Sequence, residues 1–252
     1  MKCLLLLLLV LFPAAPAGAC LICEDVPSGA EERLAGWVAE TGAAAVPRLR
    51  EILLCRENRD LRTKVIAARE LGRLGDAGSA DPLEVVVLEI LDPDSDCEFG
   101  VATPAHALRF QAARSLVSLR STEAGEKLWS ARVSLPPQRQ EELPALLYAL
   151  RTPGLEEKLV ELLDSPFRAT VFQAIVELRR SGDRRAIPAV ARTVALWKTE
   201  LEEGTAGDIR DPDLRKMIRY GEGTIRALRR MTDPGEKFGD LPAGASPAAE
   251  DR

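Results

Sequence analysis

The chain is poor in the residues that carry most catalytic chemistry. Histidine occurs once, as His106, and aromatic residues make up 4% of the 252 positions. Because histidine is a common metal ligand and the usual acid–base group near neutral pH, a single copy argues against both kinds of site. No serine has a histidine and an acid at triad spacing, and no glycine loop has the phosphate-binding pattern. We therefore expect no catalytic residue, no cofactor and no metal.

Strand signals are missing as well. Hydrophobic residues make up 46% of the chain, which is enough for a continuous core, and they recur at three- and four-residue spacing, as Val171 and Ile175 do. The β-branched run 85–87 lies in a helical segment that Asp81 and Pro82 open, since proline suits a first helical turn. These patterns predict an all-α protein with a core of alanine and leucine.

A short motif led by leucine occurs five times. The steps between successive copies are 45, 31, 31 and 50 residues. Two steps share one period and two carry insertions, which is typical of an array built from one repeated unit. The leading leucines are Leu71, Leu116, Leu147, Leu178 and Leu228.

Each unit is expected to be a hairpin of two helices. Three second helices begin alike, with alanine two residues before Pro47, Pro82 and Pro188. The predicted first helices span residues 30–40, 59–74, 104–120, 137–150, 166–180 and 212–231. The predicted second helices span residues 43–54, 79–91, 122–132, 154–163 and 184–201.

Two copies of the motif resemble a known repeat family. Leu71 begins Leu-Gly-Arg-Leu-Gly-Asp, which Ala-Asp-Pro follows at 80–82; the copy at Leu178 matches it, except that Ser181 replaces the second leucine. This pattern is similar to the HEAT repeat and to its short variant in phycobilin lyases. The resemblance covers residues 30–232 and implies a right-handed α-solenoid of about five to six stacked helical hairpins.

The family likeness is uneven and does not name a partner. The copies at Leu116 and Leu147 lack Gly-Asp and the following proline, so they are assigned from periodicity and the 31-residue step. HEAT-type repeats serve many unrelated roles. The phycobilin-lyase likeness leaves a lyase acting on tetrapyrroles as one alternative, although that family works inside the cell.

Residues 1–19 have the organisation of a secretory signal. Lys2 supplies the positive end, residues 4–12 are an unbroken apolar run, and residues 17–19 are the small Ala-Gly-Ala of a cleavage site. Nine apolar residues are too few to cross about 30 Å of hydrocarbon as a helix. The protein is therefore expected to be exported, to the periplasm or cell envelope.

The residue after the cleavage site raises the prospect of a lipid anchor. Residues 17–20, Ala-Gly-Ala-Cys, resemble the bacterial lipobox, in which the cysteine, here Cys20, is diacylated. The family pattern prefers leucine where this chain has Ala17. Cleavage by the general signal peptidase accounts for the same residues, so lipidation and plain cleavage both stay open. Residues 20–29 would form a tether, and residues 233–252, rich in proline, glycine and alanine, a disordered tail.

Export permits disulfides in the mature chain. Cys55 follows one predicted second helix and Cys97 lies beyond the next, so equivalent positions in neighbouring units bring the two close. We predict a Cys55–Cys97 disulfide, which would stabilise the fold by about 2–4 kcal/mol, with unbonded thiols as the alternative. Cys20 and Cys23 have the spacing of a redox dithiol, but the chain shows no strand pattern of a thioredoxin-like fold.

The first candidate partner-binding cluster is an acidic loop between two hairpins. It has alternating carboxylates, as the start of a calcium loop does, but Cys97 and Thr103 stand where that loop needs glycine and glutamate. A solvated acidic loop is the alternative. Its acidic residues are Asp92, Asp94, Asp96 and Glu98.

The second candidate cluster is basic. Residues 166–232 hold fourteen Lys and Arg against nine Asp and Glu, whereas the whole chain has a net charge of −5. Four arginines concentrate at one predicted helix end and turn, where they complement the helix dipole or meet an acidic protein or anionic lipid head groups. They are Arg179, Arg180, Arg184 and Arg185.

Other conspicuous residues are expected to be structural. His106 near a helix start is interpreted as a packed or capping residue. Trp37, Trp129 and Trp197 are interpreted as anchors between repeats, with an exposed one as a binding hot spot. The adjacent pair 141–142, Glu-Glu, is interpreted as part of a solvated helix face.

Three functions are compatible with these patterns. The leading one is an exported scaffold, free or lipid-anchored through Cys20, that binds another protein of the envelope. The alternatives are the lyase and a purely structural spacer. Exposed apolar residues on successive second helices would favour the scaffold over the spacer, and a convergent polar pocket would favour an enzyme with a small-molecule substrate. Export and the shortage of aromatic residues for base stacking argue against nucleic acid.

Overall fold

The computed structural model describes residues 30–55, 60–88, 104–121, 123–205 and 211–231. Within these residues the chain forms eleven α-helices and five 3₁₀ helices, with no strand among them. The all-α class predicted from the sequence is confirmed. Most observed helix ends lie within two residues of the predicted ones.

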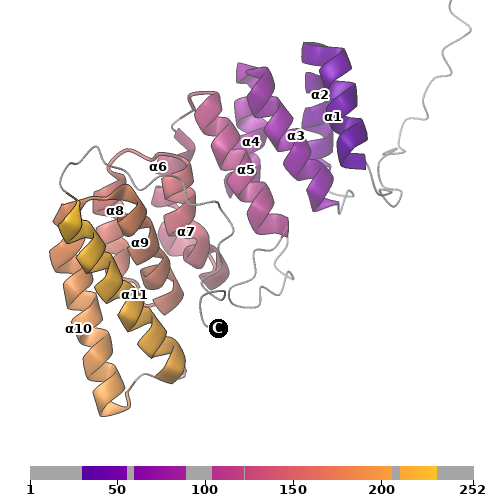
Figure 1. The fold of residues 1–252 in the computed structure, drawn as a ribbon. Coiled ribbons are helices and arrows are strands. Elements are labelled where there is room, and N and C mark those ends of the chain that lie inside the picture. Colours follow the sequence, from indigo (N-terminus) through magenta and orange to yellow (C-terminus); the bar gives the residue numbers. More distant parts are fainter. Residues whose placement is uncertain (1–29, 56–59, 89–103, 122, 206–210, 232–252) are drawn as a thin grey trace, which may run out of the picture.

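The first helices of the pairs are the odd-numbered ones in Figure 1. They average more than three turns, and each carries one copy of the buried stripe that the periodicity predicts. They are α1 (Ala30–Thr41), α3 (Leu61–Leu74), α5 (Pro104–Ser118), α7 (Pro137–Ala149), α9 (Arg168–Ser181) and α11 (Asp211–Arg230).

The second helices are the even-numbered ones, namely α2 (Val46–Leu54), α4 (Ala80–Leu88), α6 (Glu123–Ser130), α8 (Leu155–Glu161) and α10 (Ile187–Glu203). Residues 89–91, the end of one predicted second helix, lie outside the described residues. Short 3₁₀ helices precede α2, α4 and α10 and follow α6 and α8. They are η1 (Gly42–Ala45), η2 (Ala77–Ser79), η5 (Arg184–Ala186), η3 (Arg132–Ser134) and η4 (Leu162–Asp164).

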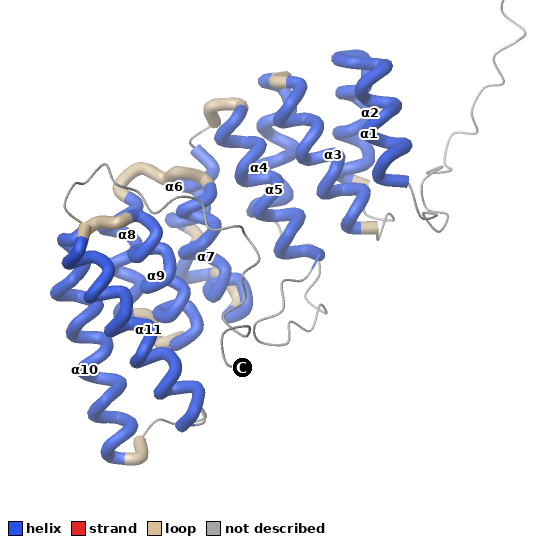
Figure 2. The backbone as a smooth tube through the Cα atoms, viewed as in Figure 1, coloured by secondary structure: helices blue, strands red, loops and turns tan. Residues whose placement is uncertain are grey.

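The helices lie in two layers and follow one another across the molecule in chain order (Figure 1). In one layer, each odd-numbered helix contacts the next, from α1 to α11; in the other, α2 contacts α4 and α4 contacts α6. Between the layers, each second helix packs against the first helix of the following pair, as α2 does against α3 and α10 against α11. Figure 2 shows the short loops that join these helices. Among the described residues, the large helix–helix interfaces therefore join only elements that are close in chain order.

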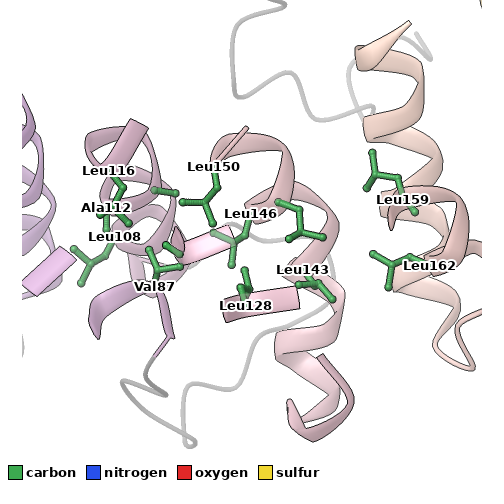
Figure 3. Close-up of a cluster of buried hydrophobic side chains, with 14 of the residues drawn as sticks. Val87, Leu108, Ala112, Leu116, Leu128, Leu143, Leu146, Leu150, Leu159 and Leu162 are labelled. Carbon is green, nitrogen blue, oxygen red and sulfur yellow. The ribbon is translucent and has the colours of Figure 1, made fainter. Parts of the chain in front are cut away.

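A continuous core runs between the layers, and leucine and alanine fill most of it. Figure 3 shows its central part, where leucines of α5, α6, α7 and α8 occupy successive spaces between the helices. The five leading leucines of the motif are all fully buried, so the repeat seen in the sequence is a repeat of core positions. They are Leu71, Leu116, Leu147, Leu178 and Leu228.

The turns after four of the five leading leucines share a backbone conformation; the position after Leu228 lies outside the described residues. Four residues after the leucine, the chain enters the left-handed region, with φ of 72° at Gly75 and 75° at Gly182. The two copies without glycine adopt the same conformation, with φ of 58° at Arg120 and 51° at Arg151. A left-handed residue ends a helix by turning the chain away from its axis. The motif is therefore structurally equivalent in all four copies.

Prolines begin the second helices as expected. Pro47 and Pro188 lie in the first two positions of α2 and α10, and Pro82 lies in the first turn of α4. The first turn tolerates proline because its N–H groups have no partner within the helix. At α3, the carboxylate of Asp60 caps the helix by accepting from the Arg62 backbone N–H at 3.1 Å.

Small residues let two first helices approach closely. A Cβ atom on Gly72 of α3 would lie 2.6 Å from the Ser115 Cβ and 2.9 Å from the Ser115 Cα of α5. The Ser115 hydroxyl donates to the Ala68 carbonyl oxygen at 2.8 Å, a bond that ties the two helices together. The α3–α5 contact thus depends on the absence of a side chain at Gly72.

Candidate functional site

Part of the predicted site lies outside the described residues. Cys55 follows α2 and is half-buried, and its backbone N–H donates to the Glu51 carbonyl oxygen at 2.9 Å. Its predicted disulfide partner, the acidic loop, the signal, the tether and the tail are not described, so these remain predictions. The predicted site residues outside the description are Cys20, Asp92, Asp94, Asp96, Cys97 and Glu98.

Two of the four predicted arginines lie in the last turn of α9; one contacts α11 and the other contacts a residue of α9. The Arg179 guanidinium lies over the ring of Tyr220 in α11, 5.3 Å from its centroid. Arg180 forms an ion pair at 2.9 Å with the fully buried Glu177. Burial raises the pKa of the Glu177 carboxyl, and the Arg180 charge opposes that shift. Both arginines therefore have partners within the fold.

The other two arginines lie in η5. Arg185 donates to the Asp183 carboxylate at 3.1 and 3.0 Å and lies 3.5 Å from Glu157 of α8. Arg184 is exposed and forms no ion pair with any residue of the described segments. The structure thus brings the four predicted arginines to one end of the helix array, but most of their charge is engaged locally.

A larger unpaired positive surface lies on α11, which the sequence analysis did not single out. Six cations on this helix are exposed, and none forms an ion pair with a described residue. Met231, just after α11, lies against Gly182, so the ends of α11 and α9 are neighbours. We call the six cations the basic face of α11; they are Arg215, Lys216, Arg219, Arg226, Arg229 and Arg230.

Exposed apolar side chains concentrate in the layer of second helices. Among the described residues, five large hydrophobic side chains are exposed, and one of them, Trp37, lies on the first helix α1. The others are Leu54 in α2, Val85 in α4, Leu196 in α10 and Val133 in η3, directly after α6. Exposure reaches 58% at Leu196 and 82% at Val133. We call these four residues the apolar row.

A buried ion pair joins α5 to α7. The Arg109 guanidinium donates two hydrogen bonds to the Glu142 carboxylate, at 2.7 Å from Nε and 2.5 Å from Nη2. The side chains are only 6% and 12% exposed, so the pair is largely shielded from water. The expectation that Glu142 belongs to a solvated face is wrong, because α5 covers it and supplies the matching guanidinium.

Two more ionisable groups adjoin this pair. Arg139 of α7 is buried and donates to the Val87 carbonyl oxygen of α4 at 2.6 Å. Burial, together with the nearby charge of Arg109, lowers the pKa of Arg139 to about 10, so it stays a cation at neutral pH. Burial also lowers the pKa of His106, whose ring packs against Phe110 with centroids 4.4 Å apart. The interpretation of His106 as a packed residue is confirmed.

Tryptophan anchors only part of the array. Trp197 is buried in α10, and the half-buried Trp129 of α6 has the Arg132 guanidinium 4.2 Å above its ring. The Lys158 ammonium of α8 lies 5.9 Å from the same ring, so Trp129 links neighbouring pairs as predicted. Trp37 is 37% exposed and is not a buried anchor.

Two further properties of the described segments bear on function. No three histidine, cysteine or acidic side chains gather there in a way that could hold a metal ion. No helix in the same segments is both long and apolar enough to cross a bilayer.

Comparisons with known proteins leave the family open. No family model matches the chain, and no curated protein matches it. Among solved structures, the chain is similar to the crystal structure of an engineered protein, with 19% identity, coverage of 82% of this chain and 87% of that chain, and a TM-score of 0.40. A likeness at that level carries no argument about fold family or activity, so the HEAT resemblance remains a prediction.

Proposed function

We propose that this protein is an exported scaffold of the cell envelope, built as a HEAT-like right-handed α-solenoid, that binds a partner protein along its second helices. The extensive helix–helix contacts, which join elements close in chain order, and the recurring left-handed turn support the solenoid. The signal-like residues 1–19 support export, and Cys20 would supply a lipid anchor where it is acylated.

The apolar row is the observation that carries the binding proposal. Water-exposed apolar side chains are costly to leave unpartnered when they recur along one layer, and such residues mark binding surfaces. The position of each row residue can be counted from the proline at the start of its own helix. Val85 of α4 lies three residues after its proline, Leu54 of α2 seven, and Leu196 of α10 eight. At about 100° per residue, these positions fall within an arc of roughly 140°. Leu54, Val85 and Leu196 therefore lie on the same side of their helices, as a shared docking surface requires. The fourth member of the row, Val133, lies in η3 and is outside this comparison.

Site-specific photo-crosslinking in the native envelope tests the proposal. A crosslinking amino acid at Leu54, Val85 or Leu196 is expected to capture one and the same protein, identified by mass spectrometry. The matched controls are the exposed positions Arg62 and Arg114 on the first helices α3 and α5, which should not capture it. A spacer without a ligand would give no common adduct at the three row positions, and that outcome would refute the proposal.

A further inference from the structure

The last helix of the array has two sharply different faces. At about 100° per residue, the six cations of the basic face fall within an arc of roughly 140°. The opposite side of α11 is buried against α10 and α9 through Leu214, Met217 and Leu228. The apolar side of this amphipathic helix is thus buried in the fold. Its polar side carries six exposed cations against the exposed Asp213 and the half-buried Glu222.

No residue in the described part of the chain forms an ion pair with the cations of this face. Some surface cations elsewhere have acidic partners, as Arg132 has Glu161 at 2.9 Å and Lys158 has Glu126 at 3.0 Å. Other exposed cations, such as Arg184, are unpaired but stand singly, whereas α11 gathers six within one arc. At about 100° per residue, Glu222 falls within the arc of the basic face. Its charge interacts with Arg226, but its carboxylate is paired at 2.6 Å with Lys198 of α10. Packing like charges together along one helix opposes folding, so a row of six unpaired cations calls for an external anion.

The form of this face points to an extended anionic surface as the occupant. The cations run from Arg215 to Arg230, about 22 Å along a straight helix at 1.5 Å per residue. No large hydrophobic residue of α11 is exposed, whereas a specific protein interface needs an apolar or aromatic centre. A charged bilayer needs only cations near its head groups. We propose that the basic face of α11 binds the surface of an anionic lipid bilayer.

This site lies at the opposite end of the array from α1, which follows the predicted tether (Figure 1). Lipid binding by α11 requires neither an acyl group on Cys20 nor a protein on the apolar row. Its failure and the failure of the scaffold proposal are therefore distinguishable. With an acylated Cys20, the two membrane contacts would hold the array lengthwise along the bilayer.

Vesicle co-sedimentation tests the inference with the full chain carrying Cys20→Ser, which removes any acyl anchor. Vesicles of phosphatidylcholine with roughly 30% phosphatidylglycerol should bind the protein at low salt, and phosphatidylcholine alone should not. Raising the salt to about 0.5 M should release it, because screening shortens the reach of surface charge. The variant Arg215→Gln/Arg219→Gln/Arg226→Gln should bind at least about tenfold more weakly.

Two further variants make the result specific. Arg33→Gln/Arg62→Gln/Arg114→Gln removes the same charge from exposed positions of α1, α3 and α5 and should bind like the parent. Replacing Arg215, Arg219 and Arg226 by lysine should preserve binding within about twofold, since a bilayer responds to charge more than to guanidinium geometry. The inference would be overturned by equal losses in both glutamine variants, by binding to neutral vesicles, or by no binding to anionic vesicles. It would also be overturned if the basic face captured an acidic protein in a pull-down while the chain failed to bind vesicles.

Discussion

At the scale of single residues, the turn after each leading leucine shows how a repeat survives sequence drift. Gly75 and Gly182 adopt the left-handed conformation at no steric cost, whereas Arg120 and Arg151 adopt it against the preference of any residue with a Cβ atom. The helix-ending hydrogen bond persists in the arginine copy after α5, where the Ser121 N–H donates to the Leu116 carbonyl oxygen at 2.9 Å. Tertiary packing holds the turn where the local preference does not.

Exchanging the residues at these turns should change stability in opposite directions. Arg120→Gly is expected to raise the free energy of unfolding by about 0.5–1 kcal/mol, because it removes the left-handed strain. Gly75→Ala, at a position with no atom within 4 Å of the added Cβ, should lower it by about 1 kcal/mol through strain alone. Urea unfolding followed by circular dichroism measures both. Changes of the same sign would show that the turn residue does not limit stability.

At the scale of helices, the neighbouring first helices α3 and α5 meet through a close contact that only a small residue permits. Gly72→Ala would place its Cβ 2.9 Å from a backbone atom of α5, so the helices must separate. We expect a loss of about 2 kcal/mol from this overpacking. Gly36→Ala in α1 is the matched control, since its Cβ meets nothing within 4 Å and alanine favours helix, for a gain of about 0.5–1 kcal/mol. Equal effects in thermal unfolding would rule out a close α3–α5 approach.

The buried ion pair between α5 and α7 gives the second prediction at this scale. Glu142→Leu alone should destabilise the protein by about 3 kcal/mol, because it strands the Arg109 charge away from water. The double variant Arg109→Met/Glu142→Leu should recover most of that loss, since neither charge then needs a partner. Chemical denaturation of the parent, Arg109→Met, Glu142→Leu and the double variant gives the coupling energy between the two side chains. A double variant as unstable as the sum of its singles would exclude direct pairing.

The same two scales separate what the sequence predicts from what it does not. Helix positions, the prolines at second-helix starts and the buried leucines follow from local spacing, so the pattern identifies them. The burial of Glu142 cannot be predicted from its neighbours in the sequence, because the pattern of adjacent acidic residues describes only one helix. Its partner Arg109 lies 33 positions away on another helix. An arginine between Leu108 and Phe110 on an apolar stripe was the available signal. The apolar row and the basic face of α11 depend on which side each helix buries, which packing decides.

At the scale of the whole molecule, the extensive contacts join helices that are close in chain order. We therefore expect a substitution at one end of the array to loosen only the helices near it. In such an array, stability is the sum of each unit and its interfaces with the next, so one end opens without the other. Leu228→Ala removes a fully buried side chain of α11, at a cost of about 2–5 kcal/mol. Hydrogen exchange read by mass spectrometry should then quicken in α9–α11 and stay unchanged in α1–α3.

The reciprocal variant at the other end completes the test. Leu49 of α2 is equally buried, and Leu49→Ala should quicken exchange in α1–α4 while α10 and α11 keep their protection. Each variant thus serves as the control for the other, since the side chain removed is the same and only its place in the array differs. Faster exchange along the entire chain in either variant would mean that the helices unfold as one cooperative unit, and the solenoid proposal would then fail.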